Sequence, residues 1–221
     1  MDQRSKILED EYKKRFESNA QYRDSVWKIL CRDFFSRYIN TESILLDLGA
    51  GWGEFSRNIE ANKKYAMDLN PDCANRVRGY AEFLQQDCAT KWPLKDHYLD
   101  IVFTSNFLEH LPNKAAVDMT LNEAFRCLKS GGRMICVGPN IRCLPGAYWD
   151  FWDHYIPLTD KSMAEALSLR GFIVKEVIPR FLPFTMSGKR NPPLIAVKAY
   201  LSMRLVWPLF GRQFFVMAEK P

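Results

Sequence analysis

The stretch LLDLGAGWGEF at residues 45–55 decides the fold. A short apolar run leads directly into three glycines at alternate positions, Gly49, Gly51 and Gly53. Glycine lets the backbone turn tightly and approach a ligand closely, because it has no Cβ atom. A helix that follows such a turn directs its free N–H groups outward. We therefore predict a strand, a ligand-binding loop and a helix, and the alternative is an ordinary strand-to-helix turn.

The spacing of these glycines indicates the class of ligand. A dinucleotide-binding loop has the spacing GxGxxG and places a pyrophosphate on the helix N-terminus. This loop has the spacing GxGxG, and Asp47 precedes it by two residues. A carboxylate at that point disfavours a phosphate group and favours a cationic ligand. A dinucleotide-dependent oxidoreductase is therefore the less favoured interpretation.

Carboxylates also end the next two strand-like runs. Asp68 ends the run 64–68 and Asp87 ends the run 82–87. Ligands of open α/β sheets bind at the carboxyl ends of the strands, where an acid can accept hydrogen bonds from both hydroxyls of a ribose. Asp68 is placed for that role, and Asp87 for an exocyclic amine such as that of adenine. Each acid alone is more often a helix cap or a solvated loop residue, but three successive strand ends favour a nucleoside ligand.

Strand-like runs alternate with helical segments along the whole chain. This alternation predicts a Rossmann-like, doubly wound α/β fold with a mostly parallel sheet. An N-terminal segment, residues 5–39, has apolar residues at helical spacing and predicts two helices broken around residues 18–22. The predicted strands are 44–48, 64–68, 82–87, 99–105, 133–138, 172–178 and 213–217.

The length of 221 residues fits one domain with a sizeable core. We divide it into an N-terminal helical lid or extension (1–43), a cofactor-binding core (44–178), a basic insert (179–212) and a last strand (213–221). No apolar run approaches the roughly 18–20 residues of a membrane span, and the charged N-terminus lacks a signal sequence. We therefore expect a cytoplasmic protein.

Cysteine and histidine show no metal-ligand spacing. The six cysteines form no CxxC pair, and the chain has three histidines. We expect buried reduced thiols and no metal site.

The basic insert, residues 179–212, carries the positive charge of the chain. No acidic residue occurs from Val177 to Ala218, whereas the net charge of the whole chain is +5. The insert begins with prolines and then predicts an amphipathic helix over residues 194–206, which Trp207, Pro208 and Gly211 would end. Three interpretations stay open: peripheral contact with a membrane at its inner face, a grip on an anionic substrate, or packing on the core or on a second subunit. The insert also contains aromatic residues of an exposed type: Phe181, Phe184, Trp207 and Phe210.

Residues 44–138 resemble a class I S-adenosylmethionine-dependent methyltransferase. The motifs that carry this resemblance are LLDLGAGWGEF, AMDLNPD, QQDCAT, LDIVFTSNFLEHL and CLKSGGRMICVGPN. The resemblance implies seven strands, the last one antiparallel and inserted beside the sixth, with S-adenosylmethionine as cofactor. It also implies a set of cofactor-binding residues: Asp47, Gly49, Ala50, Gly51, Gly53, Asp68, Leu69, Asp87, Cys88 and Asn106.

Two segments are candidates for catalysis and substrate binding. The first is residues 105–110, in which His110 is the natural base by its ordinary pKa and Glu109 is its acidic neighbour. The second is residues 148–155, where aromatic, acidic and histidine side chains could form a substrate-facing wall that includes His154. The alternatives are that Glu109 and His110 merely begin a helix, and that the second segment is a packed loop. Expected substrate contacts are Tyr12, Tyr148, Trp149, Asp150 and Trp152.

These features predict an O-methyltransferase for a sugar, a glycan or a related small molecule. A looser resemblance to methyltransferases of bacterial polysaccharide synthesis favours this acceptor class. The alternatives are a lipid-linked acceptor, or a non-catalytic cofactor-binding or membrane-surface module. We expect a monomer or homodimer and no nucleic-acid partner, because no RNA-binding module is visible.

Overall fold

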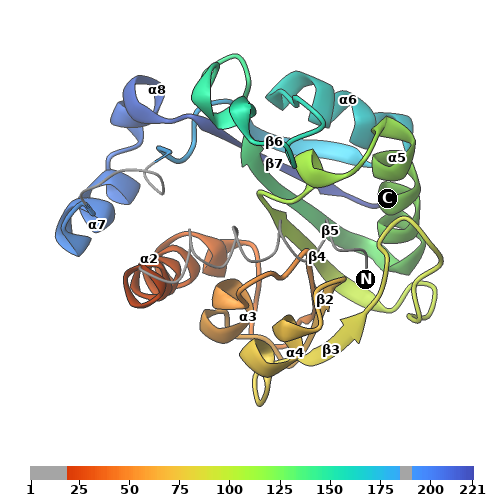
Figure 1. Cartoon of the computed structure of the whole chain (residues 1–221). Coiled ribbons are helices and arrows are strands. Elements are labelled where there is room, and N and C mark those ends of the chain that lie inside the picture. Colours follow the sequence, from red (N-terminus) through yellow and green to blue (C-terminus); the bar gives the residue numbers. More distant parts are fainter. Residues whose placement is uncertain (1–18, 185–190) are drawn as a thin grey trace.

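The computed structural model describes residues 19–184 and 191–221 (Figure 1). Its centre is a seven-stranded sheet in the order β3-β2-β1-β4-β5-β7-β6. The pairs among β1 to β5 are parallel, and β7 is antiparallel to both β5 and β6. The strands are β1 (Ile44–Leu48), β2 (Lys63–Asp68), β3 (Glu82–Gln85), β4 (Leu99–Ser105), β5 (Leu128–Pro139), β6 (Ile173–Ile178) and β7 (Gln213–Glu219). The predicted fold class, including the inserted antiparallel strand, is confirmed.

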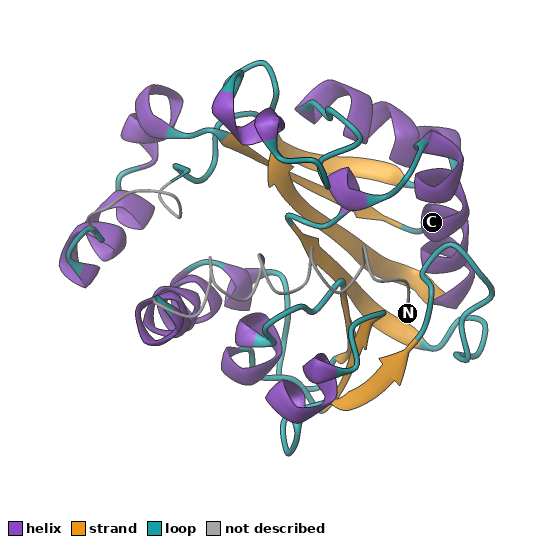
Figure 2. Ribbon diagram, in the orientation of Figure 1, coloured by secondary structure: helices purple, strands orange, loops and turns teal. Residues whose placement is uncertain are grey.

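Helices cover both faces of this sheet (Figure 2). The α-helices are α2 (Ala20–Asp33), α3 (Glu54–Asn58), α4 (Asp72–Val77), α5 (Lys114–Cys127), α6 (Asp160–Leu169), α7 (Leu194–Ser202) and α8 (Trp207–Phe210). The 3-10 helices are η1 (Phe35–Arg37), η2 (Leu108–His110), η3 (Ala147–Asp150) and η4 (Arg204–Val206). The first of the two predicted N-terminal helices falls largely on residues 1–18, outside the described residues, and the second is α2.

The two faces of the sheet explain the continuous apolar runs of its strands. Leu45 packs into one buried cluster with Phe103 and Phe215, and Leu46 packs into another with Val102 and other side chains. Successive side chains of a strand point to opposite faces, so a strand buried on both faces needs apolar residues at every position. All six cysteines are free and buried, as predicted.

The basic insert packs against the N-terminal helix, and this corrects two of its predicted exposed aromatics. Phe181 is fully buried and Trp207 is 3% exposed. The ring of Phe34, at the end of α2, lies 4.2 Å from Phe181 and 6.0 Å from Trp207, measured between centroids. These rings are therefore core residues, whereas Phe210 is 59% exposed.

The predicted helix over residues 194–206 begins at Leu194 as expected, but it is shorter than predicted and is not amphipathic. Helix α7 ends at Ser202, and Trp207 begins α8 with Pro208 in its first turn, a position that tolerates proline. Apolar side chains occur on all sides of α7: Leu201 is buried, whereas Ile195 is 74% exposed. In the described part of the chain, no helix is long and apolar enough to cross a membrane.

Candidate functional site

A cavity of about 580 Å³ opens at the carboxyl edge of the sheet. Most of its lining comes from α2, from the glycine loop after β1 with the start of α3, and from the segments that follow β4 and β5. The first residue of β7, Gln213, also lines it, because an antiparallel strand starts at the edge where its neighbours end. The volume lies within the range of about 300–1,000 Å³ that is typical of small-molecule sites.

The glycine loop has the backbone that only glycine adopts readily. Gly49, Gly51 and Gly53 have φ values of +72°, +52° and +71°. A Cβ atom on Gly49 would lie 2.1 Å from the Phe107 ring, and one on Gly53 would lie 2.6 Å from Val77. The loop is therefore a close-fitting turn, and any side chain at Gly49 or Gly53 would displace its neighbours.

Asp47 is the one predicted acid that faces the cavity. It is 4% exposed, and its Oδ2 accepts a hydrogen bond of 2.6 Å from the Ser56 hydroxyl. Burial raises the pKa of Asp47 to about 7, partly offset by the hydrogen bond from Ser56. A buried carboxylate of this kind favours a positively charged ligand group, because opposite charge compensates for its lost hydration.

Five of the ten predicted cofactor residues lie outside the lining. Asp68 accepts backbone hydrogen bonds of 2.8 Å from Gly51 and from Asn70, so it orders the glycine loop. Asp87 is exposed and accepts from the backbone N–H of Ala89. The set outside the cavity is Gly53, Asp68, Leu69, Asp87 and Cys88, whereas Gly49, Ala50, Gly51 and Asn106 line it beside Asp47.

A buried ion pair joins α2 to the start of α3, and sequence reasoning missed it. Arg23 is 3% exposed, and its Nε and Nη2 both donate to Oε1 of Glu54 at 2.9 and 2.6 Å. The Trp52 ring lies near two guanidinium groups, at 5.0 Å from Arg23 and 3.7 Å from Arg76. No sequence signal links an arginine to a glutamate so far along the chain, since the pairing depends on how α2 packs.

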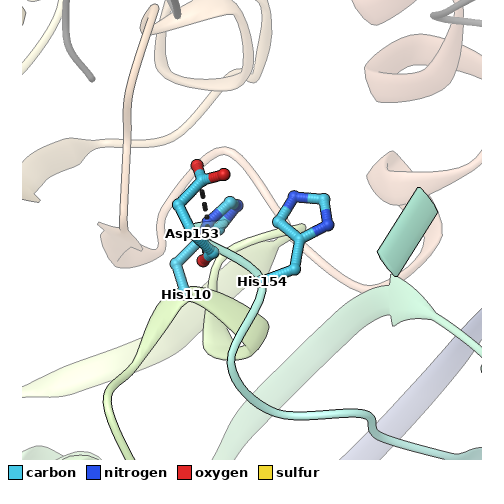
Figure 3. A group of neighbouring side chains, drawn as sticks. All are labelled: His110, Asp153 and His154. Atoms are coloured by element: carbon cyan, nitrogen blue, oxygen red, sulfur yellow. Dashed lines mark hydrogen bonds and ion pairs between the residues drawn. The ribbon is translucent and has the colours of Figure 1, made fainter. Parts of the chain in front are cut away.

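Three side chains of the cavity lining form a compact group (Figure 3). Nδ1 of His110 lies 2.9 Å from the carbonyl oxygen of Asp153 and 3.4 Å from its Oδ2. The rings of His110 and His154 lie 4.7 Å apart at their centroids. Nδ1 of His154 lies 2.5 Å from the carbonyl oxygen of Tyr148. The structure thus brings together His110 and His154, and it adds Asp153.

The electrostatics of this group differ from one member to the next. Burial lowers the pKa of His110, but the hydrogen bond to Asp153 and the charges of Glu109 and Asp153 outweigh it, so the pKa is raised. The hydrogen bond to His110 lowers the pKa of Asp153 to about 2. Burial and the charge of His110 lower the pKa of His154. The pKa of His110 is therefore shifted upward and that of the adjacent His154 downward.

Glu109, a predicted catalytic residue, lies outside the lining of this cavity. It is 1% exposed, and its Oε1 accepts a hydrogen bond of 2.6 Å from the Tyr148 hydroxyl. Its carbonyl oxygen accepts from the backbone N–H groups of Tyr155 and Ile156. Glu109 belongs to η2, and these hydrogen bonds hold the loop after β5 against that helix.

The predicted aromatic wall is only partly formed by the predicted residues. Tyr148 lines the cavity, whereas Trp149, Asp150 and Trp152 do not, and Tyr12 lies outside the described residues. Ser105, Phe151, Asp153, Phe184 and Gln213 line the cavity without having been singled out as site residues.

Gln213 is the most informative of these additions. It is 6% exposed, and its Oε1 has no hydrogen-bond partner among the described residues. A buried amide oxygen without a partner is costly, so a ligand donor would stabilise it.

Comparison with known proteins agrees with this architecture. Residues 46–136 match the methyltransferase domain family. The chain is 26% identical over 149 residues to the ubiquinone/menaquinone biosynthesis C-methyltransferase UbiE of Bartonella bacilliformis, covering 60% of this chain and 56% of that protein. Residues 46–136 are thus the part of the chain that resembles a methyltransferase domain. S-adenosylmethionine is the cofactor of this domain.

Two solved structures share the fold of this methyltransferase domain and its surroundings. One is an S-adenosylmethionine-dependent methyltransferase from Archaeoglobus fulgidus, with a TM-score of 0.66 and 22% identity over 91% of this chain and 97% of that chain. The other belongs to the Haloferax volcanii complex between the Trm112 methyltransferase activator and a methyltransferase, with a TM-score of 0.68 and 18% identity over 92% and 93%. The chain spans about half the length of the curated relatives that it matches, 44% of one and 56% of another.

The residues of the methyltransferase domain fit its cofactor. The glycine loop leaves no room for side chains at Gly49 and Gly53, and Gly49 and Gly51 line the cavity. Asp47 supplies a buried negative charge beside that loop, which matches a ligand with a sulfonium and an ammonium group. The polar edge formed by Asp68 and Asp87 continues from the loop along β2 and β3.

Proposed function

We propose that the protein transfers a methyl group from S-adenosylmethionine to a hydroxyl group of a sugar, a glycan or a related small molecule. One observation carries the proposal: a single cavity joins the glycine loop and Asp47 to the group of His110, Asp153 and His154. A methyltransferase needs both halves within reach of each other, because the acceptor must approach the methyl carbon in line with the leaving sulfur.

The cofactor half is assigned to the residues of the glycine loop and the neighbouring strand ends. When bound, S-adenosylmethionine supplies a methyl carbon on a sulfonium, and transfer breaks the carbon–sulfur bond with its electron pair left on sulfur. We assign its amino-acid end to the neighbourhood of Asp47, its ribose to Asp68 and its adenine to Asp87. The full set is Asp47, Gly49, Ala50, Gly51, Gly53, Asp68, Leu69, Asp87, Cys88 and Asn106.

The acceptor half is assigned to the segments after β4 and β5. A hydroxyl has to lose its proton as its oxygen bonds to carbon, and His110 with Asp153 and His154 is the part of the lining that can bring this about. Glu109 supports that group indirectly, because its carboxylate accepts a hydrogen bond from the hydroxyl of Tyr148. Tyr148, Phe151 and Phe184 supply aromatic faces against which a ring-shaped acceptor can lie.

Calorimetry and a labelled-methyl assay test this proposal in sequence. We expect S-adenosylhomocysteine to bind with one site per chain and NAD not to bind. We then expect labelled methyl transfer into hydroxylated glycan or lipid-linked acceptors, which His110→Ala reduces while S-adenosylhomocysteine affinity holds. Binding of NAD without binding of S-adenosylhomocysteine would contradict the cofactor assignment.

The atom that receives the methyl group is part of the same test. UbiE, one of the relatives, is named as a C-methyltransferase. Proton and carbon NMR of the product separate the two outcomes, because an O-methyl and a C-methyl carbon differ strongly in chemical shift. We expect the O-methyl signal, and a C-methyl product would overturn the hydroxyl as acceptor atom.

A second candidate function is contact with an anionic membrane, which would present the cavity to a lipid-linked acceptor. It is favoured by the apolar surface of α7, η4 and α8, which lie at the left margin of Figure 1. Leu205 and Leu209 are 92% and 67% exposed there, and Arg204 and Lys198 are exposed beside them. Apolar side chains with basic neighbours match the surface of an anionic bilayer.

Vesicle sedimentation tests the membrane contact. We expect binding to phosphatidylglycerol vesicles, weaker binding to phosphatidylcholine vesicles, and loss of binding in the double variant Leu205→Glu with Leu209→Glu. Leu169→Glu is the matched control, because Leu169 is 71% exposed on α6, away from this surface. Equal binding by both variants would exclude α8 and η4 as the contact.

A further inference from the structure

We propose that His110, Asp153 and His154 bind one divalent first-row transition-metal ion in the acceptor half of the cavity. The inference rests on the proposed function in one respect: the ion would hold and activate the acceptor hydroxyl. The binding itself is a property of the three side chains (Figure 3) and is measured without any acceptor.

The spacing of the ligand atoms is the first argument. One ligand atom from each of the three residues lies within 4.8 Å of the others. Nδ1 of His110 and Oδ2 of Asp153 are 3.4 Å apart. Two ligands at about 2.1 Å from a tetrahedral ion are separated by about 3.4 Å. Nδ1 and Oδ2 therefore have the spacing of a shared ion, which Nδ1 of His110 would bind in place of its 2.9 Å contact with the Asp153 carbonyl oxygen.

The chemistry of the donor set is the second argument. Two imidazoles and one carboxylate form the combination that zinc, iron and other first-row ions prefer over calcium and magnesium. The carbonyl oxygen of Tyr148 lies 2.5 Å from Nδ1 of His154. Such a carbonyl fixes the N–H on Nδ1 and leaves the lone pair of Nε2 for a metal, as is usual for ligating histidines.

The charges around the group are the third argument. Among the described residues that line the cavity, Arg23 is the only lysine or arginine, and it donates to Glu54. Asp153 contributes a carboxylate to the group itself, and the charges of both Glu109 and Asp153 act on His110. The described part of the lining therefore presents one arginine side chain to a dication, and that side chain is paired with Glu54.

An ion held by three protein ligands keeps open positions for the acceptor. A hydroxyl bound there has a lowered pKa and releases its proton to solvent, as metal-bound water does. Its oxygen then forms the bond to the methyl carbon while the carbon–sulfur bond breaks and its electron pair remains on sulfur. The ion is unchanged by the transfer, so no oxidant or reductant is required.

Cobalt(II) titration of chelator-treated full-length protein tests the proposal through its visible absorption bands, with zinc calorimetry as a second readout. We expect one ion per chain for the natural sequence, and a loss of affinity of more than about tenfold in His154→Ala and Asp153→Asn. His97→Gln is the matched control, because the remaining histidine of the chain lies elsewhere and contacts Lys220 at 3.2 Å. Affinity for S-adenosylhomocysteine checks that each variant is folded.

The two proposals fail separately. If the natural protein binds no cobalt or zinc ion, or if His97→Gln weakens binding as much as His154→Ala, the metal site is refuted. Methyl transfer that persists after chelation, and that His110→Ala removes, refutes the metal while the proposed function stands. Stoichiometric metal binding without methylation of any hydroxylated acceptor supports the site and refutes the proposed reaction.

Discussion

Phe107 fills the space that a side chain on Gly49 would need. A Cβ atom at that position would lie 2.1 Å from Cγ of the Phe107 ring. Phe107 follows β4, whereas Gly49 follows β1, so the contact joins two loops of the carboxyl edge of the sheet. The conformation of the glycine loop therefore depends on the segment that also carries His110.

Substitution of Gly49 tests this contact. Gly49→Ala combines a positive φ with a steric clash, so we expect a loss of stability of about 2–4 kcal/mol. We also expect S-adenosylhomocysteine affinity to fall more than tenfold, measured by calorimetry. Gly131→Ala is the control, because Gly131 has a φ of +78° but no heavy atom within 4 Å of its Cβ position. Equal losses in the two variants would show that strain, and not Phe107, is responsible.

The raised pKa of Asp47 predicts opposite effects on stability and on cofactor binding. The carboxyl group of Asp47 has a pKa of about 7 in the folded protein, against an ordinary value of 3.8. Between these values the folded state binds more protons than the unfolded state, so stability falls as pH rises through the interval. We expect Asp47→Asn to stabilise the ligand-free protein at pH 8 by on the order of 3 kcal/mol in chemical denaturation.

The same substitution should weaken cofactor binding. Asparagine removes the negative charge that faces the cofactor, so S-adenosylmethionine affinity should fall in Asp47→Asn at pH 8. In the natural protein, affinity should fall as pH drops below about 7, where the carboxylate becomes protonated. An Asp47→Asn protein that binds the cofactor normally would remove Asp47 from the site.

The buried pair of Arg23 and Glu54 predicts a large cost when one partner is removed. Arg23→Met leaves a buried carboxylate without its guanidinium, and we expect a loss of about 3–5 kcal/mol in denaturant unfolding. Arg32→Met is the control, because Arg32 and Asp33 form an ion pair with side-chain exposures of 58% and 32%. Such surface pairs contribute about 0–1 kcal/mol. Similar losses in both variants would contradict the buried role of Arg23.

The aromatic cluster around Phe34 predicts that the basic insert is part of the core. Phe181→Ala should cost about 3–5 kcal/mol, because it leaves a cavity among fully buried rings. Phe210→Ala, at a position that is 59% exposed, should cost less than about 1 kcal/mol. Thermal unfolding measures both, and a small effect of Phe181→Ala would show that residues 179–184 pack loosely.

Sequence patterns predicted the sheet well because local rules determine its strands. The apolar run from Leu45 to Leu48 and the glycines after it need no knowledge of distant residues, and the strand over 99–105 has the predicted bounds. The ends of β3 and β5 differ by two or more residues, since pairing with neighbours decides where a ladder stops.

The site could be predicted only where it follows the strand ends. Asp47 is the last but one residue of β1, Gly49 follows β1, and His110 ends η2, the short helix after β4; all three line the cavity. Asp153 and Gln213 could not be singled out, because their places depend on how the loop after β5 folds back and on the direction of β7. The exposed position of Trp152 and the buried position of Trp207 likewise follow from tertiary packing that composition does not encode.

The insertion of β7 between β5 and β6 has a consequence for synthesis on the ribosome. β6 is at the edge of the sheet, and its neighbour is β7, so residues 173–178 have no strand partner until residues 213–219 have emerged. Gln213 reaches the cavity on that same strand. The nascent chain therefore exposes an unpaired strand until this late segment docks. A chain released before residue 213 would carry the glycine loop but would lack β7, and with it a complete sheet and a complete acceptor pocket.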